Sequence, residues 1–140
     1  RLVWEDRSTY LARHAPASGG DRAPAPTAAD GTSGGEPLTA VQEWRLPSGL
    51  GRRHARVSGD YNPVHLYAIT ARAFGFPRAI AHGMWTIARC VAASPDAVGV
   101  TASFLRPVLL PSTVTYASND QQFELRSHAG LHLTGTQRFT

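Results

Sequence analysis

The sequence contains no lysine, only one cysteine and no long apolar run. A lone cysteine, Cys90, cannot form a disulfide within the chain or supply a thiolate metal cluster. A membrane-spanning helix needs roughly 20 consecutive apolar residues, so none is expected. These absences favour a cytoplasmic protein. The chain begins at Arg1 rather than Met and carries no signal-peptide pattern, which indicates a processed or trimmed piece.

Arginine carries all of the basic charge. The 14 arginines exceed the 10 acidic residues, and the net charge is +4. A basic balance suits an anionic molecule such as a nucleic acid, a membrane surface or a phosphorylated cofactor. The densest cluster is Arg52, Arg53 and Arg56, with no aromatic residues interleaved. Nucleic-acid binders carry a basic stripe, so we expect no nucleic-acid binding here.

Residues 15–37 divide the chain by composition. Of these 23 residues, 19 are Ala, Pro, Gly, Ser or Thr, and none is a larger apolar residue. Such a segment buries too little surface to offset the entropy of ordering, so we expect a flexible linker. Residues 1–14 have the pattern of one or two strands at the end of a preceding unit. Residues 38–140 are long enough for one compact domain.

Within residues 38–140 the pattern predicts one short strand, then two helices and finally a run of strands. A short strand is expected over 44–46, and helices are expected over 64–74 and 82–93. The helix over 82–93 is apolar almost all round, so it should be buried. Alternation of apolar and polar residues over 98–139 predicts a run of antiparallel strands. This order favours an α+β fold with a sheet around the buried helix.

The segment Ser58-Gly-Asp-Tyr-Asn-Pro-Val-His65 combines turn residues with groups that can do chemistry. A purely structural interpretation is open, because Asp60 or Asn62 can cap a helix that begins at Pro63. A chemical interpretation uses the same loop. Asp60 and His65 lie five residues apart across the cap, so a carboxylate and an imidazole could face one water molecule. Such a pair can remove one proton and return another, as the addition of water to a double bond requires.

A second block, His82-Gly83-Met84, follows His65 after 16 residues. Gly83 is expected to open the buried helix, where its N–H points outward at the positive end of the helix dipole. Without a side chain in the way, this N–H could bind a substrate carbonyl as an oxyanion site does. Asn62 could hold the His65 ring in the required tautomer or reach the same pocket.

No metal site is expected. His54, His65, His82 and His128 show no HxxxH or HxH spacing among them, and such spacing is typical of zinc ligands. Cys90 lies on the apolar helix and is expected to be a core thiol.

Three blocks of the sequence resemble the signature of the MaoC-like (R)-specific enoyl-CoA hydratases and dehydratases: SGDYNPVH at 58–65, GF at 75–76 and AHGM at 81–84. The match covers most of residues 50–110. The resemblance implies a hot-dog fold, in which an antiparallel sheet wraps a long central helix. It also implies that Asp60 and His65 are the catalytic pair, that Asn62 supports them, and that the Gly83 N–H binds the thioester carbonyl.

The resemblance implies a thioester substrate, carried by coenzyme A or an acyl carrier, and no other cofactor. Further substrate-site residues are then expected in and around the motif blocks: Ser58, His82, Met84, Arg78 and Arg106. Of these, His82 is expected to support the site from the start of the helix. The two arginines could meet the phosphates of coenzyme A.

The resemblance also bears on partners. Double hot-dog members place a degenerate half before the catalytic one, and residues 1–14 would be the terminal strands of such a half. A single half leaves a long sheet edge, so we expect either a homodimer or pairing with a first half of the same polypeptide. After His65 the sequence reads Leu-Tyr-Ala-Ile, whereas many members carry Asp or Asn and then Pro, and the acyl chain-length preference is left open.

The predicted reaction is the reversible hydration of a trans-2-enoyl thioester to the (R)-3-hydroxyacyl thioester. Two alternatives remain at this point. One is a non-catalytic subunit that binds acyl thioesters in lipid or polyketide assembly. The other is a hot-dog thioesterase, which would release a free thiol.

Overall fold

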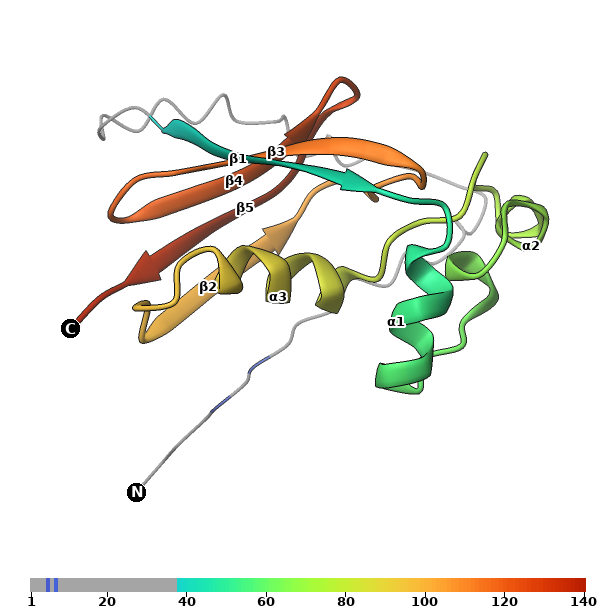
Figure 1. Ribbon diagram of the computed structural model, residues 1–140, viewed down its shortest axis with the longest axis horizontal. Coiled ribbons are helices and arrows are strands. Elements are labelled where there is room, and N and C mark those ends of the chain that lie inside the picture. Colours follow the sequence, from blue (N-terminus) through green and yellow to red (C-terminus); the bar gives the residue numbers. More distant parts are fainter. Residues whose placement is uncertain (1–4, 6, 8–37) are drawn as a thin grey trace, which may run out of the picture. The chain divides into compact units, whose positions relative to one another are not determined.

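The computed structural model describes Glu5, Arg7 and residues 38–140. Apart from Glu5 and Arg7, the predicted strands within residues 1–14 and the predicted linker over 15–37 lie outside the described residues. From residue 38 onward the chain forms, in order, β1 (Thr39–Leu46), α1 (Leu50–Ser58), the 3₁₀ turn η1 (Pro63–His65), α2 (Ala68–Ala73), α3 (Gly83–Ala92), β2 (Gly99–Phe104), β3 (Ser112–Ser118), β4 (Gln122–Ser127) and β5 (Gly130–Arg138) (Figure 1). Over the described part of the chain, no helix is long and apolar enough to cross a membrane.

The five strands form one sheet in the order β1-β3-β4-β5-β2. Every neighbouring pair is antiparallel, and β1 and β2 lie at the two edges. Helix α3 packs against one face of this sheet, while α1 and α2 lie near one end of it (Figure 1). The predicted α+β arrangement, an antiparallel sheet around a helix, is confirmed.

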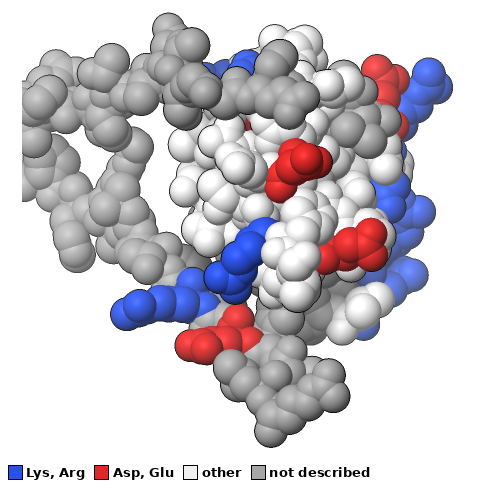
Figure 2. Space-filling model, turned by 90° about the vertical axis from the view of Figure 1, so that its left-hand side faces the viewer, with Lys and Arg blue, Asp and Glu red and all other residues white. Residues whose placement is uncertain are grey.

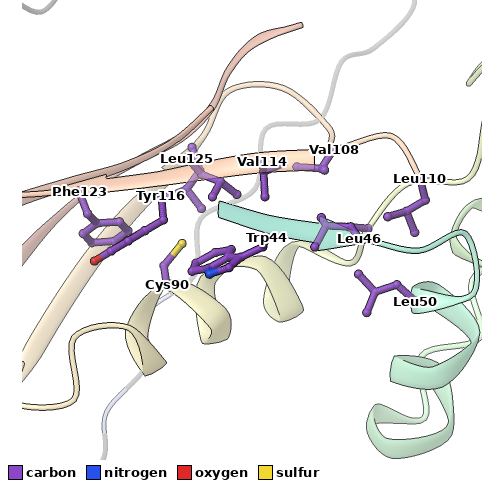
Figure 3. Close-up of a cluster of buried hydrophobic side chains, with 12 residues drawn as sticks. Trp44, Leu46, Leu50, Cys90, Val108, Leu110, Val114, Tyr116, Phe123 and Leu125 are labelled. Atoms are coloured by element: carbon purple, nitrogen blue, oxygen red, sulfur yellow. The ribbon is translucent and has the colours of Figure 1, made fainter. Parts of the chain in front are cut away.

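The core lies between the sheet and α3 (Figure 3). Tyr116 of β3 is fully buried, and its ring stacks on Trp44 of β1 with the ring centroids 5.4 Å apart. Cys90 projects into the same cluster from α3 and is 1% exposed. Burial raises the pKa of the Cys90 thiol to about 12, so almost no reactive thiolate forms near neutral pH. Cys90 is therefore a core thiol, as predicted.

The helical region differs from the prediction in three ways. The helix expected over 64–74 is split into η1 and α2, because Tyr67 adopts an extended conformation with φ −142° and ψ 151°. Helix α1 was not predicted, since most of its residues are polar. Helix α3 follows the predicted range closely, but it is not buried all round: the sheet covers one face, and Met84 on the other side is 61% exposed.

Gly135 of β5 allows the core to close over this strand. A Cβ at Gly135 would lie 2.2 Å from the Phe123 ring and 2.6 Å from the Thr101 carbonyl oxygen. Phe123 is itself 2% exposed and has little room to move. In the paired strand β2, a Cβ at Gly99 would instead meet the flexible end of Arg138 at 3.1 Å. The two glycines thus differ in the neighbours that a methyl group would displace.

We predict that Gly135→Ala lowers the free energy of unfolding by about 1–3 kcal/mol, because the added methyl overpacks the sheet. The matched variant Gly99→Ala should change it by no more than about 0.5 kcal/mol, because only a mobile guanidinium has to move. Urea unfolding measures both values. Equal unfolding midpoints for the two variants would contradict this account of Gly135.

Candidate active site

Short-range hydrogen bonds shape the loop that carries Asp60. Helix α1 ends at Gly59, which has a φ of 76° and so occupies the left-handed region that glycine tolerates. The Ser58 hydroxyl donates to the His54 carbonyl oxygen at 3.0 Å and accepts the Asp60 N–H at 3.2 Å. Ser58 therefore holds the loop in place from the end of α1.

Asn62 caps the 3₁₀ turn. Its Oδ1 accepts the Val64 N–H at 3.3 Å, and Pro63 occupies the first position of the turn. Its own N–H donates to Asp60 Oδ1 at 3.1 Å. The structural interpretation of this loop therefore holds for Asn62. This structural role does not exclude chemistry, because the hydrogen bonds of the turn use Asp60 Oδ1 and not Asp60 Oδ2.

His65 is held by a backbone carbonyl rather than by Asn62. Its Nδ1 lies 2.9 Å from the Ile80 carbonyl oxygen. A carbonyl oxygen can only accept, so Nδ1 carries the proton and Nε2 of the neutral ring keeps a free lone pair. This Nε2 lies 4.0 Å from Asp60 Oδ2. The His65 side chain is 12% exposed and that of Asp60 is 52% exposed.

Burial is the main reason why the pKa of His65 lies below its usual value of 6.5. The bond to Ile80 and the Asp60 carboxylate oppose this effect, while His82 and His54 reinforce it. The 4.0 Å gap is too long for a direct hydrogen bond and suits one bridging water molecule. A neutral imidazole and a carboxylate therefore face a gap in which water can lose a proton.

His82 connects the start of α3 to the Asp60 loop. Its side chain is 3% exposed, and its Nε2 donates to the Asp60 carbonyl oxygen at 3.0 Å. Its ring stacks on that of His65, with centroids 3.8 Å apart and an interplanar angle of 25°. His82 thus supports both members of the predicted catalytic pair.

A cavity of about 290 Å³ brings together the two motif blocks. His65 and Gly83 both line it, and much of the remaining wall is the segment 104–108. The Gly83 N–H lies in the first turn of α3, where a helix offers no acceptor of its own. A Cβ at Gly83 would meet the Phe104 ring at 3.4 Å, so a larger side chain would fill the approach to this N–H. A second hollow, along β2 and β5, is lined by none of the motif residues.

The other predicted substrate residues lie outside this cavity, apart from Arg106. Arg106 lines the cavity and donates to the Ala129 carbonyl oxygen. Arg78 donates to the Pro111 carbonyl oxygen at 3.0 Å. On the face that Figure 2 shows, several arginines lie along the right-hand edge, while acidic side chains lie among uncharged ones nearer the middle.

A metal site is geometrically conceivable at the same place. Asp60, His65 and His82 offer ligand atoms that all lie within 4.8 Å of one another. However, the two imidazoles are stacked nearly parallel, so their in-plane lone pairs lie side by side and do not converge on one point. One nitrogen of each ring also donates to a carbonyl. This arrangement fits a water molecule better than an ion.

His128 and His132 have an HxxxH spacing, which the expectation of no metal site did not take into account. His132 is buried and lines the cavity. Its Nε2 bonds the Ser127 hydroxyl at 2.7 Å and its Nδ1 bonds the Arg106 carbonyl oxygen at 3.2 Å. Both ring nitrogens are therefore engaged within the protein, and His132 serves to hold the cavity wall.

Helix α1 contributes residues that the sequence analysis missed. A Cβ at Gly51 would lie 1.8 Å from the His65 carbonyl oxygen, so only glycine allows α1 to approach η1 this closely. Ala55, one turn later, is fully buried. The sequence signal that could have indicated this close contact is the pair of small residues, Gly51 and Ala55, four positions apart in a largely polar segment.

Comparisons with known proteins agree with the motif. The profile of the MaoC-like domain family matches residues 32–128. The 3-hydroxyacyl-thioester dehydratase X of Mycobacterium tuberculosis is 36% identical over 147 residues, covering 98% of this chain and 51% of that protein. The peroxisomal enoyl-CoA hydratase 2 of Arabidopsis thaliana is 44% identical over 52 residues, covering 37% of this chain and 16% of that protein. The chain thus spans about half the length of the first relative.

Solved structures show the same fold. The crystal structure of HtdX from Mycobacterium tuberculosis has a TM-score of 0.61 and 38% identity, covering 72% of this chain and 48% of that one. The R-hydratase PhaJ1 from Pseudomonas aeruginosa has a TM-score of 0.61 and 27% identity, covering 73% and 79%. These similarities confirm the predicted hot-dog fold.

We predict that the His65 ring titrates below pH 6.5 in the folded protein, because burial disfavours the imidazolium. The unfolded chain then binds more protons between that folded value and 6.5, so the free energy of unfolding should fall as the pH drops through this interval. NMR titration of the ring resonances measures the pKa directly, and the exposed-residue variant His128→Gln should leave it unchanged. A folded pKa at or above 6.5 would contradict the buried, neutral His65.

Proposed function

This chain belongs to the MaoC-like domain family, and from that premise we propose that it interconverts a trans-2-enoyl thioester and an (R)-3-hydroxyacyl thioester by adding or removing water. The observation that carries the proposal is the 4.0 Å gap between His65 Nε2 and Asp60 Oδ2, at the edge of a cavity that Gly83 also lines. The similarity to a 3-hydroxyacyl-thioester dehydratase and to an R-hydratase supports this reaction class.

In hydration, a water molecule lies between Asp60 and His65 and loses a proton to the pair. Its oxygen bonds to the β-carbon of the enoyl group, and the π electrons move onto the thioester oxygen to give an enolate. The enolate then collapses and takes a proton at the α-carbon. His65 Nε2 and the carboxylate start without a proton to give, so the proton returned to carbon is the one taken from water.

Gly83 stabilises the charge that develops on the thioester oxygen. Its N–H lies at the start of a helix of 10 residues, where the helix dipole favours a negative group. An amide that is already oriented toward the developing oxyanion needs no rearrangement during the reaction. The glycine also leaves the carbonyl free to approach, which any larger side chain beside Phe104 would prevent.

A second hot-dog half is proposed to cover the apolar surface of this one. In the sheet formed by residues 39–138, β1 and β2 each have a free edge. Exposed apolar side chains cluster around the start of α3 and the end of β2: Met84 is 61% exposed, Phe104 55% and Leu105 58%. Patches of this kind mark interaction sites, so we propose a homodimer or pairing with a preceding half of the same polypeptide.

The decisive activity test follows the loss of enoyl-thioester absorbance with short and long trans-2-enoyl-CoA. We expect turnover by the wild type and an (R)-3-hydroxyacyl product. Asp60→Asn and His65→Gln should each reduce kcat by about 100-fold or more, because each removes one of the two proton-handling groups. Gly83→Val should reduce it by about 100-fold, because it blocks the oxyanion site.

The matched control His128→Gln should retain activity, because this exposed histidine lies outside the cavity. Free thiol release measured in the same assay would favour a thioesterase instead. Binding of the enoyl-CoA without turnover, unaffected by Asp60→Asn, would favour a non-catalytic thioester-binding subunit.

For the assembly, light scattering should give a particle of about twice the 15.0 kDa chain mass. Met84→Glu should shift this particle toward the monomer, because it places a charge in the apolar patch. Val57→Glu, at an 87% exposed position on α1, is the matched control and should leave the mass unchanged. If the wild type is a monomer at micromolar concentration, the homodimer is wrong, and pairing with a preceding half of a longer polypeptide is the remaining alternative.

A further inference from the structure

A third imidazole, His54, extends the stack formed by His65 and His82. Its ring packs against that of His82 in a T-shaped arrangement, with centroids 4.6 Å apart and an interplanar angle of 64°. Neither the sequence motif nor the reaction described above uses His54. The three rings come from three separate elements, which are α1, η1 and the residue that caps α3.

His54 is held firmly although α1 is largely polar. Gly51 lets the α1 backbone lie against the His65 carbonyl, and Ala55 buries the next turn. On the same helix, the Arg52 guanidinium donates to the Leu66 carbonyl oxygen at 2.7 Å, just after η1. Helix α1 is thus anchored at His65, the last residue of η1, and at Leu66, the residue after it, and it carries His54 with it.

The orientation of the His82 ring needs such support. Its Nε2 makes one hydrogen bond, to the Asp60 carbonyl oxygen, and its buried Nδ1 has no partner among the described residues. One polar contact does not by itself fix the plane of a ring. Beyond this bond, Nε2 lies 3.8 Å from Asp60 Oδ2, and the ring packs against the rings of His65 and His54.

We propose that His54 is a positioning residue of the hydratase site: it holds the ring of His82, which in turn holds the Asp60 backbone and the face of His65. This inference rests on the proposed function. Loss of the His54 ring lets His82 tilt, which loosens both members of the water-binding pair. Small misplacements of this kind are costly because the reacting atoms must be aligned.

His54 also affects the charge state of His65. The groups that act on the His65 imidazole are Asp60 in the loop, His82 at the start of α3 and His54 on α1, together with the Ile80 carbonyl. Burial lowers the pKa of His54 below 6.5, and His82 lowers it further, while Asp60 raises it. Protonated His54 makes a second proton on the stack less favourable. Removing His54 should therefore raise the pKa of His65.

Two variants separate the packing role from the charge role. His54→Gln removes both the aromatic ring and the titrating group, whereas His54→Phe keeps an aromatic ring. We expect His54→Gln to lower kcat by about tenfold with KM changed less than about twofold, since the water-binding pair is misaligned. His54→Phe should recover kcat to within about threefold of the wild type. Both should move the acidic limb of the pH profile to higher pH, and His128→Gln should change neither quantity.

NMR titration of the His65 ring gives a readout that needs no turnover. Both His54 variants should raise the pKa of His65 relative to the wild type, even if the chain hydrates no enoyl thioester. A wild type without hydratase activity would therefore refute the proposed function, while the His65 titration would still test the effect of His54 on the stacked rings. Wild-type kcat in His54→Gln together with an unchanged His65 titration would overturn the inference, as would equal losses of kcat in the two variants. If His54→Gln does not fold, the pH profile of His54→Phe tests the inference: its acidic limb should lie at higher pH than that of the wild type, and an unchanged limb would overturn the inference.

Discussion

The hydrogen bond from His65 Nδ1 to the Ile80 carbonyl is the contact on which the site depends. It fixes the tautomer of His65, and the Ile80 N–H returns a bond to the Val64 carbonyl at 3.0 Å. Ile80 also pairs with Leu109, and its neighbour Ala81 donates to the Val108 carbonyl at 2.8 Å. Residues 79–81 therefore join the 3₁₀ turn to the cavity wall, so the His65 ring cannot rotate without disturbing the fold around it.

The sheet and α3 act as the platform for this arrangement. Cys90 and the stacked Trp44 and Tyr116 hold α3 against the sheet, and the start of that helix supplies both Gly83 and His82. The Asp60 loop is attached from the other side, by Ser58 at the end of α1 and by His82. The proposed acid–base groups, Asp60 and His65, and the proposed oxyanion donor, Gly83, thus come from separate elements that a single packed core holds in fixed positions.

The sequence predicted the parts of the structure that leave a side-chain pattern. Alternation located β2 to β5, and the motif singled out Asp60, His65 and Gly83, of which the last two line one cavity. It did not reveal Ile80 as the residue that orients His65, because a backbone carbonyl has no residue-type signature. Nor did it reveal α1, because most residues of this helix are polar and only a few small residues such as Gly51 and Ala55 make its buried contact. Nor did it reveal the break at Tyr67, whose extended backbone interrupts a segment with a helical pattern.

The central claim is that Asp60 and His65 share a water molecule beside a thioester carbonyl held by Gly83. A high-resolution crystal structure with a saturated acyl-CoA, which cannot be hydrated, tests it most directly. The account predicts a water within hydrogen-bond distance of both Asp60 Oδ2 and His65 Nε2, and the thioester oxygen on the Gly83 N–H. A thioester bound away from Gly83, or a metal ion bridging Asp60, His65 and His82, would contradict it.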